Sequence, residues 1–98
     1  METEFSTVPA VLPDQITAKA IVRDEDQRPI AWSQTVTYEP DAAFATGDAV
    51  RFVLQIGGMQ QHPSGHYEYD VELISYYDGE PFLSVYTGSF DHLNVSRT

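Results

Sequence analysis

The strongest constraint on this fold is a long alternating run followed by a tight-turn signal. Residues 66–77 have a strand pattern, and in residues 66–73 apolar and polar side chains alternate with the period of two that places them on opposite faces of a β-strand. Asp78-Gly79 follows, and residues 82–88 again have a strand pattern. An Asp-Gly step between two such runs is the strongest short hairpin signal. We therefore predict a β-hairpin that includes residues 66–86.

Three earlier runs also have strand patterns. Residues 16–23 and 30–38 alternate on either side of a polar turn, which predicts another hairpin. Residues 49–56 alternate as well. Residues 39–48 are expected to form a loop with at most one helical turn, and the glycines and proline of residues 57–65 predict a second loop. No window has the i, i+3, i+4, i+7 apolar spacing of a helix.

Five strands with short connections predict an all-β fold. We expect a small antiparallel β-sandwich, loosely immunoglobulin-like, or an open barrel of five to six strands with an extended N-terminal arm. Residues 1–14 would form that arm, residues 15–90 the domain and residues 91–98 a C-terminal tail. The predicted core consists of Ile16, Val22, Ile30, Trp32, Val36, Val50, Phe52, Leu54, Ile56, Tyr67, Tyr69, Val71, Leu73 and Val85.

Two segments resemble the strand openings of immunoglobulin-like modules. Residues 47–52 (GDAVRF) begin with a Gly-Asp step, and residues 64–71 (SGHYEYDV) contain a Gly-x-Tyr step at the start of a strand. This resemblance implies a sandwich and says nothing about activity, because one fold hosts many functions.

Charge and cysteine content limit the function classes. The chain has 15 acidic and 5 basic residues, a formal net charge of −10, and no cysteine. Such a charge repels nucleic acid and anionic lipid, so we expect direct binding to neither, and no apolar run is long enough to span a membrane. Without cysteines there is no disulfide, thiolate metal site or cysteine nucleophile. The absence of a signal-peptide pattern adds to the expectation of a cytoplasmic protein.

No catalytic motif stands out, so we expect a protein that is not an enzyme and carries no cofactor. Neither a Gly-x-Ser-x-Gly motif nor a phosphate-binding loop occurs. His62, His66, Glu68 and Asp70 are types that ligate zinc or manganese, but their spacing matches no metal motif. We assign no metal ligands. A metal-dependent enzyme that uses His66 remains the weakest alternative.

One face of the predicted hairpin carries three carboxylates. Glu68, Asp70 and Glu72, called the acidic row here, project at intervals of about 6.5–7 Å. The simplest interpretation is a solvated face that is paired with basic side chains of neighbouring strands. The candidates for such pairing are Lys19, Arg23 and Arg51. The functional interpretation is a surface that attracts a basic protein or imitates a phosphate backbone.

The tip of the hairpin, residues 74–86, is apolar on both faces. Beyond Glu72 the polar face of the first strand continues as Ile74 and Tyr76, and apolar residues also occupy both faces of the returning strand. Both faces therefore need covering, one by the core and the other by the N-terminal arm, a second subunit or a partner. The predicted contact residues are Tyr76, Tyr77, Phe82 and Tyr86. Trp32 is assigned to the core rather than to a sugar-binding surface.

These features predict a non-catalytic module that binds protein or assembles. It would dock through residues 74–86, while the acidic row steers a basic partner. A homo-oligomer is a possible form of this assembly. The alternative is an acidic inhibitor that blocks a nucleic-acid-binding groove of another protein.

Overall fold

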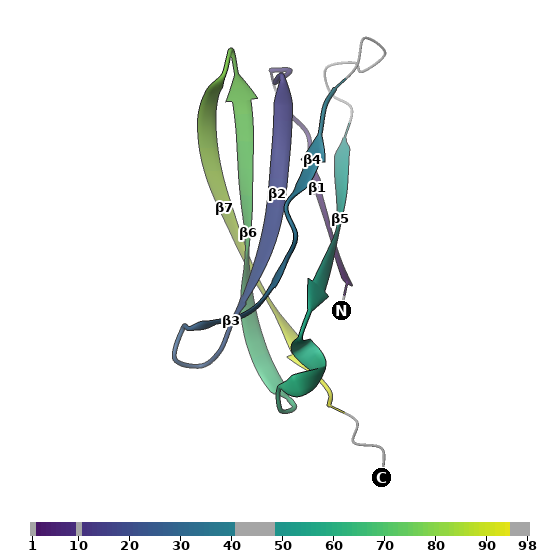
Figure 1. Cartoon of the computed structure of the whole chain (residues 1–98), viewed down its shortest axis with the longest axis vertical. Coiled ribbons are helices and arrows are strands. Elements are labelled where there is room, and N and C mark those ends of the chain that lie inside the picture. Colours follow the sequence, from purple (N-terminus) through teal and green to yellow (C-terminus); the bar gives the residue numbers. More distant parts are fainter. Residues whose placement is uncertain (1, 10, 41–48, 95–98) are drawn as a thin grey trace.

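The computed structural model describes residues 2–9, 11–40 and 49–94, whose regular secondary structure is almost entirely β-strand (Figure 1). The all-β prediction is therefore confirmed. A 3₁₀ turn, Met59–Gln61, joins two of the strands. In chain order the strands are β1 (Glu2–Thr7), β2 (Gln15–Arg23), β3 (Pro29–Ser33), β4 (Val36–Tyr38), β5 (Val50–Gly57), β6 (Gly65–Tyr77) and β7 (Glu80–His92).

The strands form one antiparallel sheet that curls into a half-barrel. Their order is β1-β5-β3-β2-β6-β7, and β4 pairs with β2 further along the same side as β3. In Figure 1, β6 and β7 lie on the left, β1 and β5 on the right, and β2 between them. This curled sheet corresponds to the open-barrel form of the prediction. The immunoglobulin-like resemblance remains a prediction.

The N-terminal segment contributes a strand. Glu2–Thr7 pairs with β5 from Glu2 opposite Gln55 to Thr7 opposite Val50. The expected arm therefore extends the sheet at one edge, whereas β7 forms the other edge. The predicted loop of residues 39–48 lies largely outside the described residues.

The predicted hairpin of β6 and β7 is confirmed. Its pairing runs without a break from Tyr77 opposite Glu80 to Gly65 opposite His92. Asp78 and Gly79 both have positive φ, 52° and 83°, as a two-residue type I′ turn requires. The strand prediction for residues 82–88 was too short, because pairing with β6 continues to His92.

The core lies on the concave face of the sheet. It includes most of the predicted residues: Ile16, Val22, Val50, Phe52, Leu54, Ile56, Tyr67, Val71 and Leu73. Three others are only partly buried against this core, namely Ile30, Val36 and Tyr69. The prediction missed Ala18, Ala20, Ala31, Ser33 and Met59, all of which are buried. Met59 fills the core from the 3₁₀ turn, in a segment that was predicted to be a loop.

Trp32 was predicted in the core, but its residue surface is 58% exposed. The cause is a β-bulge. Trp32 pairs with Ile21 and Val36 pairs with Ala18, so two residues of β2 face three residues between Trp32 and Val36. The extra residue reverses the alternation, and buried Ser33 and partly buried Val36 then face inward on either side of the bulge.

Val85 was also wrongly placed in the core, since it is 52% exposed. It stands opposite Glu72, whereas its neighbour Tyr86 stands opposite the buried Val71. Directly opposite residues share a face of the sheet. Val85 therefore lies on the convex face and Tyr86 on the concave face.

Candidate functional site

The acidic row lies on the convex face of β6, next to basic residues of β2. Glu68 is in register with Arg23, and Glu72 is in register with Lys19. The Arg23 Nε donates a hydrogen bond to Asp70 Oδ2 at 2.7 Å. Two cations therefore flank the three carboxylates, so the local field is weaker than the sequence alone suggests.

Arg51, the third predicted partner of the acidic row, lies elsewhere. It is on β5 and forms an ion pair with Glu4 of β1. The neighbouring cross-strand pair is also polar, because Gln55 Nε2 donates to Glu2 Oε2 at 2.6 Å. These contacts belong to the opposite edge of the sheet and have no part in the hairpin surface.

The four predicted contact residues divide between the two faces of the hairpin. Tyr76 stands opposite Pro81 and shares the convex face with the acidic row. Tyr77, Phe82 and Tyr86 belong to the concave side, where the rings of Tyr77 and Phe82 meet edge to face with centroids 5.4 Å apart. The structure thus brings three of the four together on one face.

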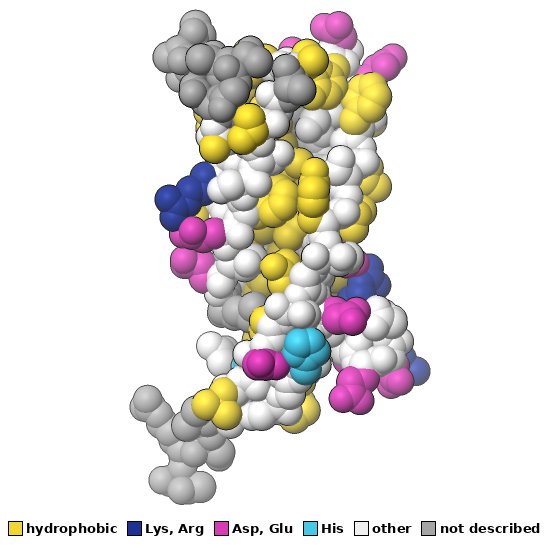
Figure 2. Space-filling view, turned by 180° about the vertical axis from the view of Figure 1, so that it is seen from behind, with side chains coloured by type: hydrophobic (Ala, Val, Ile, Leu, Met, Phe, Trp, Pro, Cys, Tyr) yellow, Lys and Arg dark blue, Asp and Glu magenta, His cyan; other side chains and the backbone are white. Residues whose placement is uncertain are grey.

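The N-terminal part of the chain covers some of this apolar surface. The ring of Phe5 on β1 lies 4.9 Å from the ring of Tyr86, centroid to centroid, across the open side of the half-barrel. Figure 2 shows apolar side chains gathered along the middle of this side, with charged groups mainly around them. Tyr77 also donates a hydrogen bond from its hydroxyl to the carbonyl of Val11 at 3.2 Å.

Most of β7 stays exposed in spite of these contacts. Four of its large apolar side chains belong to residues that are 45% to 62% exposed, namely Phe82, Leu83, Val85 and Tyr86. Phe82 and Tyr86 face the concave side, and Leu83 and Val85 face the convex side. No described strand pairs with the outer edge of β7. We call this strand with its free backbone the β7 edge.

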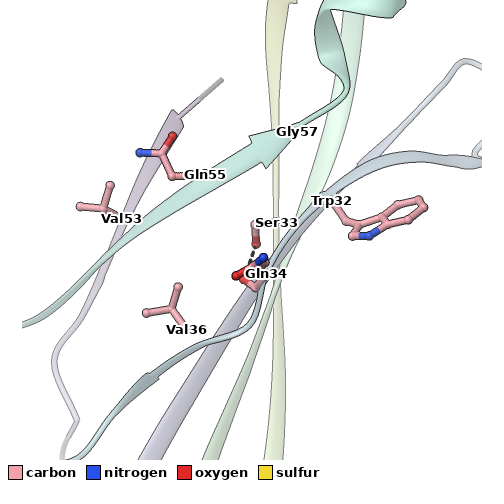
Figure 3. A pocket seen from close by; sticks show the side chains of 7 residues that line it. All are labelled: Trp32, Ser33, Gln34, Val36, Val53, Gln55 and Gly57. Carbon is pink, nitrogen blue, oxygen red and sulfur yellow. Dashed lines mark hydrogen bonds between the residues drawn. The ribbon is translucent and has the colours of Figure 1, made fainter.

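Apart from the β7 edge, a hollow lies beside Trp32, on the half of the sheet that contains β3 and β5 (Figure 3). It measures about 580 Å³ and is lined by Trp32, Ser33, Gln34, Val36, Val53, Gln55 and Gly57. It arises because β5 pairs with β3 only through Trp32–Gly57 and Ser33–Ile56. Sequence analysis missed this Trp32 groove because it placed the tryptophan in the core.

The described residues contain neither a group of side chains suited to a metal ion nor a helix suited to spanning a membrane. His66 lies beside Asp91, with Nδ1 and Oδ1 2.8 Å apart. Within the described ranges, no three His, Cys, Asp or Glu side chains are grouped so that they could hold a metal ion. No helix in the described residues is long and apolar enough to cross a lipid bilayer.

Comparisons with known proteins assign no family. No protein-family model matches the chain, and no curated protein or solved structure is significantly similar to it. The fold and the surface together define an all-β half-barrel with a long apolar edge.

Proposed function

We propose that this chain is a non-catalytic protein-binding module that docks through residues 74–86 and the β7 edge. The observation that carries the proposal is the exposure of Phe82, Leu83, Val85 and Tyr86 along one strand. Exposed apolar side chains that form a continuous patch are typical of interaction sites, whereas single ones are ordinary. Aromatic side chains are also enriched in protein interfaces.

The backbone of the β7 edge suits the addition of a partner strand. In a two-residue turn, the carbonyl of Tyr77 accepts a hydrogen bond from the amide of Glu80, and the pattern then alternates along the pair. Even-numbered residues of β7 consequently bond to β6. The odd-numbered residues from Leu83 to Asp91 point their amides and carbonyls toward the free edge. A strand that adds here gains main-chain hydrogen bonds as well as apolar contacts.

The acidic row would act on the approach of a basic partner rather than on its final affinity. The net charge of −10 attracts cationic surfaces over a distance set by ionic strength. Arg23 and Lys19 lower the negative field directly beside the row. The alternative of an inhibitor that imitates nucleic acid has less support for the same reason, since a phosphate-like row needs uninterrupted negative charge.

Peptide selection by phage display tests this proposal without knowledge of the natural partner. Wild-type protein should enrich peptides with alternating apolar residues that bind as strands. Their affinity should fall at least tenfold in Val85→Lys, because a lysine on the β7 edge opposes pairing. Val53→Lys is the matched control, since Val53 is an exposed valine on β5. Equally strong peptide binding by wild type and Val85→Lys, or no enrichment by a wild type that is monomeric, would refute the proposal.

Carbohydrate binding is a second candidate, which the exposure of Trp32 favours. The indole lies between the Trp32 groove and a smaller hollow of about 330 Å³, and the amides of Gln34 and Gln55 line the larger one. Apolar rings combined with a few polar groups are typical of small-ligand sites. Trp32 is the only tryptophan, so titration with a panel of oligosaccharides should change its fluorescence. Unchanged emission across the panel would exclude this candidate.

A further inference from the structure

The two edges of the sheet differ in length and charge. β1 has six residues, and its Glu2 and Glu4 are held by polar side chains of β5. β7 has 13 residues, and none of residues 82–90 is charged in a chain that carries 20 acidic and basic residues. Short, charged edges resist pairing with other chains, whereas long, apolar ones invite it. The β7 edge is therefore the one that needs an occupant.

The sequence of β7 is partly symmetric about Tyr86, because four of its six pairs of positions match in type, whereas Leu83 with Ser89 and Pro81 with Asp91 do not. An antiparallel pair of identical strands sets each residue opposite the one at equal distance on the other side of the twofold axis. With the axis at Tyr86, a β-branched residue faces a β-branched residue, and a small residue faces a small one. An aromatic residue likewise faces an aromatic one, and an acidic residue faces a histidine. The matched positions are Val85 with Thr87, Ser84 with Gly88, Phe82 with Phe90 and Glu80 with His92.

We propose that the β7 edge binds the β7 edge of a second copy of this chain, antiparallel and with the twofold axis at Tyr86. This inference rests on the proposed function, because it names the partner of the same docking surface. The two half-barrels then share one continuous sheet. The charged β1 edge of each copy discourages pairing with a further chain, so the assembly closes as a dimer.

Backbone hydrogen bonding agrees with this register. The odd-numbered residues of β7 point outward, so Val85 and Thr87 of opposite copies can exchange two bonds, as can Leu83 and Ser89. Pro81 has no amide hydrogen to offer at the edge, but its carbonyl can accept from the amide of Asp91. Tyr86 would then face Tyr86 of the second copy as a non-hydrogen-bonded pair, whose side chains approach most closely.

The end of β7 provides a further argument. In the proposed register Glu80 of the second copy stands opposite His92, and opposite residues have β-carbons about 4.5–5.5 Å apart. An acidic residue thus stands opposite a histidine at each end of the paired strands.

Other symmetric registers match the strand less well. An axis at Val85 sets Phe82 opposite Gly88, which leaves each phenylalanine without an aromatic neighbour. An axis at Ser84 pairs Phe82 with Tyr86 but leaves residues 89–92 beyond the end of the partner strand. Only the axis at Tyr86 pairs the strand along its full length.

Charge predicts how such a dimer responds to salt. Each copy carries a net charge of −10, so two copies repel one another and added salt screens that repulsion. Dimerisation should therefore strengthen as sodium chloride increases. Binding of a basic partner should weaken under the same change, which separates the two kinds of occupant.

Cross-linking tests the register, because the chain has no cysteine of its own. A short bismaleimide should link Leu83→Cys to Ser89→Cys in a mixture of the two variants, and neither variant to itself. Residue 83 of one copy faces residue 89 of the other copy, and residue 83 of that other copy is six residues further along the strand. The two residues 83 are therefore about 20 Å apart in the dimer. Tyr86→Cys alone should also cross-link. The mixed pair leaves Tyr86 intact, so the test does not depend on that ring.

Analytical ultracentrifugation tests the dimer itself. Wild type should sediment as a dimer whose dissociation constant falls at least severalfold between low and high salt. Val85→Lys should be a folded monomer, and Val53→Lys a dimer. A monomeric wild type at all concentrations, or self-linking of Leu83→Cys, would overturn the inference. If wild type is monomeric and Val85→Lys, but not Val53→Lys, loses peptide binding, the β7 edge is still a docking surface and only the dimer is refuted. If wild type is monomeric and Val85→Lys binds peptides as well as wild type does, both the dimer and the docking function are refuted.

Discussion

The ring of Tyr69 lies against the backbone of Gly88 on the opposite strand. A β-carbon placed on Gly88 would come within 2.6 Å of Tyr69 Cζ and of its hydroxyl oxygen. The two residues are paired directly across β6 and β7, and the Tyr69 ring also lies 6.1 Å from the ring of Phe90, centroid to centroid. The glycine thus makes room for an aromatic side chain on the concave face.

Replacing Gly88 by alanine should lower the free energy of unfolding by about 1–3 kcal/mol, the usual cost of overpacking. Gly57→Ala is the matched control, because a β-carbon there meets no atom within 4 Å. Urea denaturation would measure both. The loss should shrink when Tyr69 is also replaced by alanine, since the clash is then gone. A Gly88→Ala loss that is equally large without the Tyr69 ring would contradict this explanation.

The hairpin could be predicted from sequence because its determinants are local. The alternation of residues 66–73 and the Asp78-Gly79 turn specify the pairing without knowledge of the rest of the chain. The exposure of Trp32 could not be predicted in this way, since it depends on a one-residue bulge against β2. Gln34, which interrupts the apolar positions between Trp32 and Val36, was the available signal.

The sequence predicted which residues of the candidate site share a face, but it could not predict which side chains of other strands lie beside them. The sequence placed Glu68, Asp70 and Glu72 on one face correctly, because alternation decides that. It could not choose between Arg51 and Arg23 as the cation beside Asp70, because that choice depends on strand order in the curled sheet. Strand order follows from non-local pairing, for which the sequence contains no short-range signal.

Removing the hydroxyl of Ser33 should destabilise the bulge. Ser33 is buried, its Oγ accepts a hydrogen bond from the amide of Ala20 at 2.9 Å, and its hydroxyl donates to the carbonyl of Gln34 at 2.9 Å. Ser33→Ala leaves the buried Ala20 amide without this acceptor, which costs about 1–3 kcal/mol. Chemical denaturation should show the loss for Ser33→Ala and little change for Thr35→Ala, an exposed position nearby. Equal stability of Ser33→Ala and wild type would contradict this role.

The ion pair beside the acidic row should contribute more than the one at the β1 edge. The side chains of Arg23 and Asp70 are 32% and 15% exposed, whereas those of Arg51 and Glu4 are 62% and 52% exposed. Arg23→Ala should cost about 1 kcal/mol, because Asp70 is left between two other carboxylates, and Arg51→Ala should cost almost nothing. Thermal unfolding at low and high salt is the measurement. The difference between the variants should narrow with salt; equal losses at low salt would argue against the ranking.

The position of Trp32 can be checked by fluorescence, because it is the only tryptophan. Because the Trp32 residue is 58% exposed, its indole should emit close to the wavelength of indole in water, and acrylamide should quench it efficiently. Acrylamide is preferred to iodide because a net charge of −10 repels an anionic quencher. A blue-shifted emission that resists quenching would place the ring in an apolar interior or beneath a bound partner.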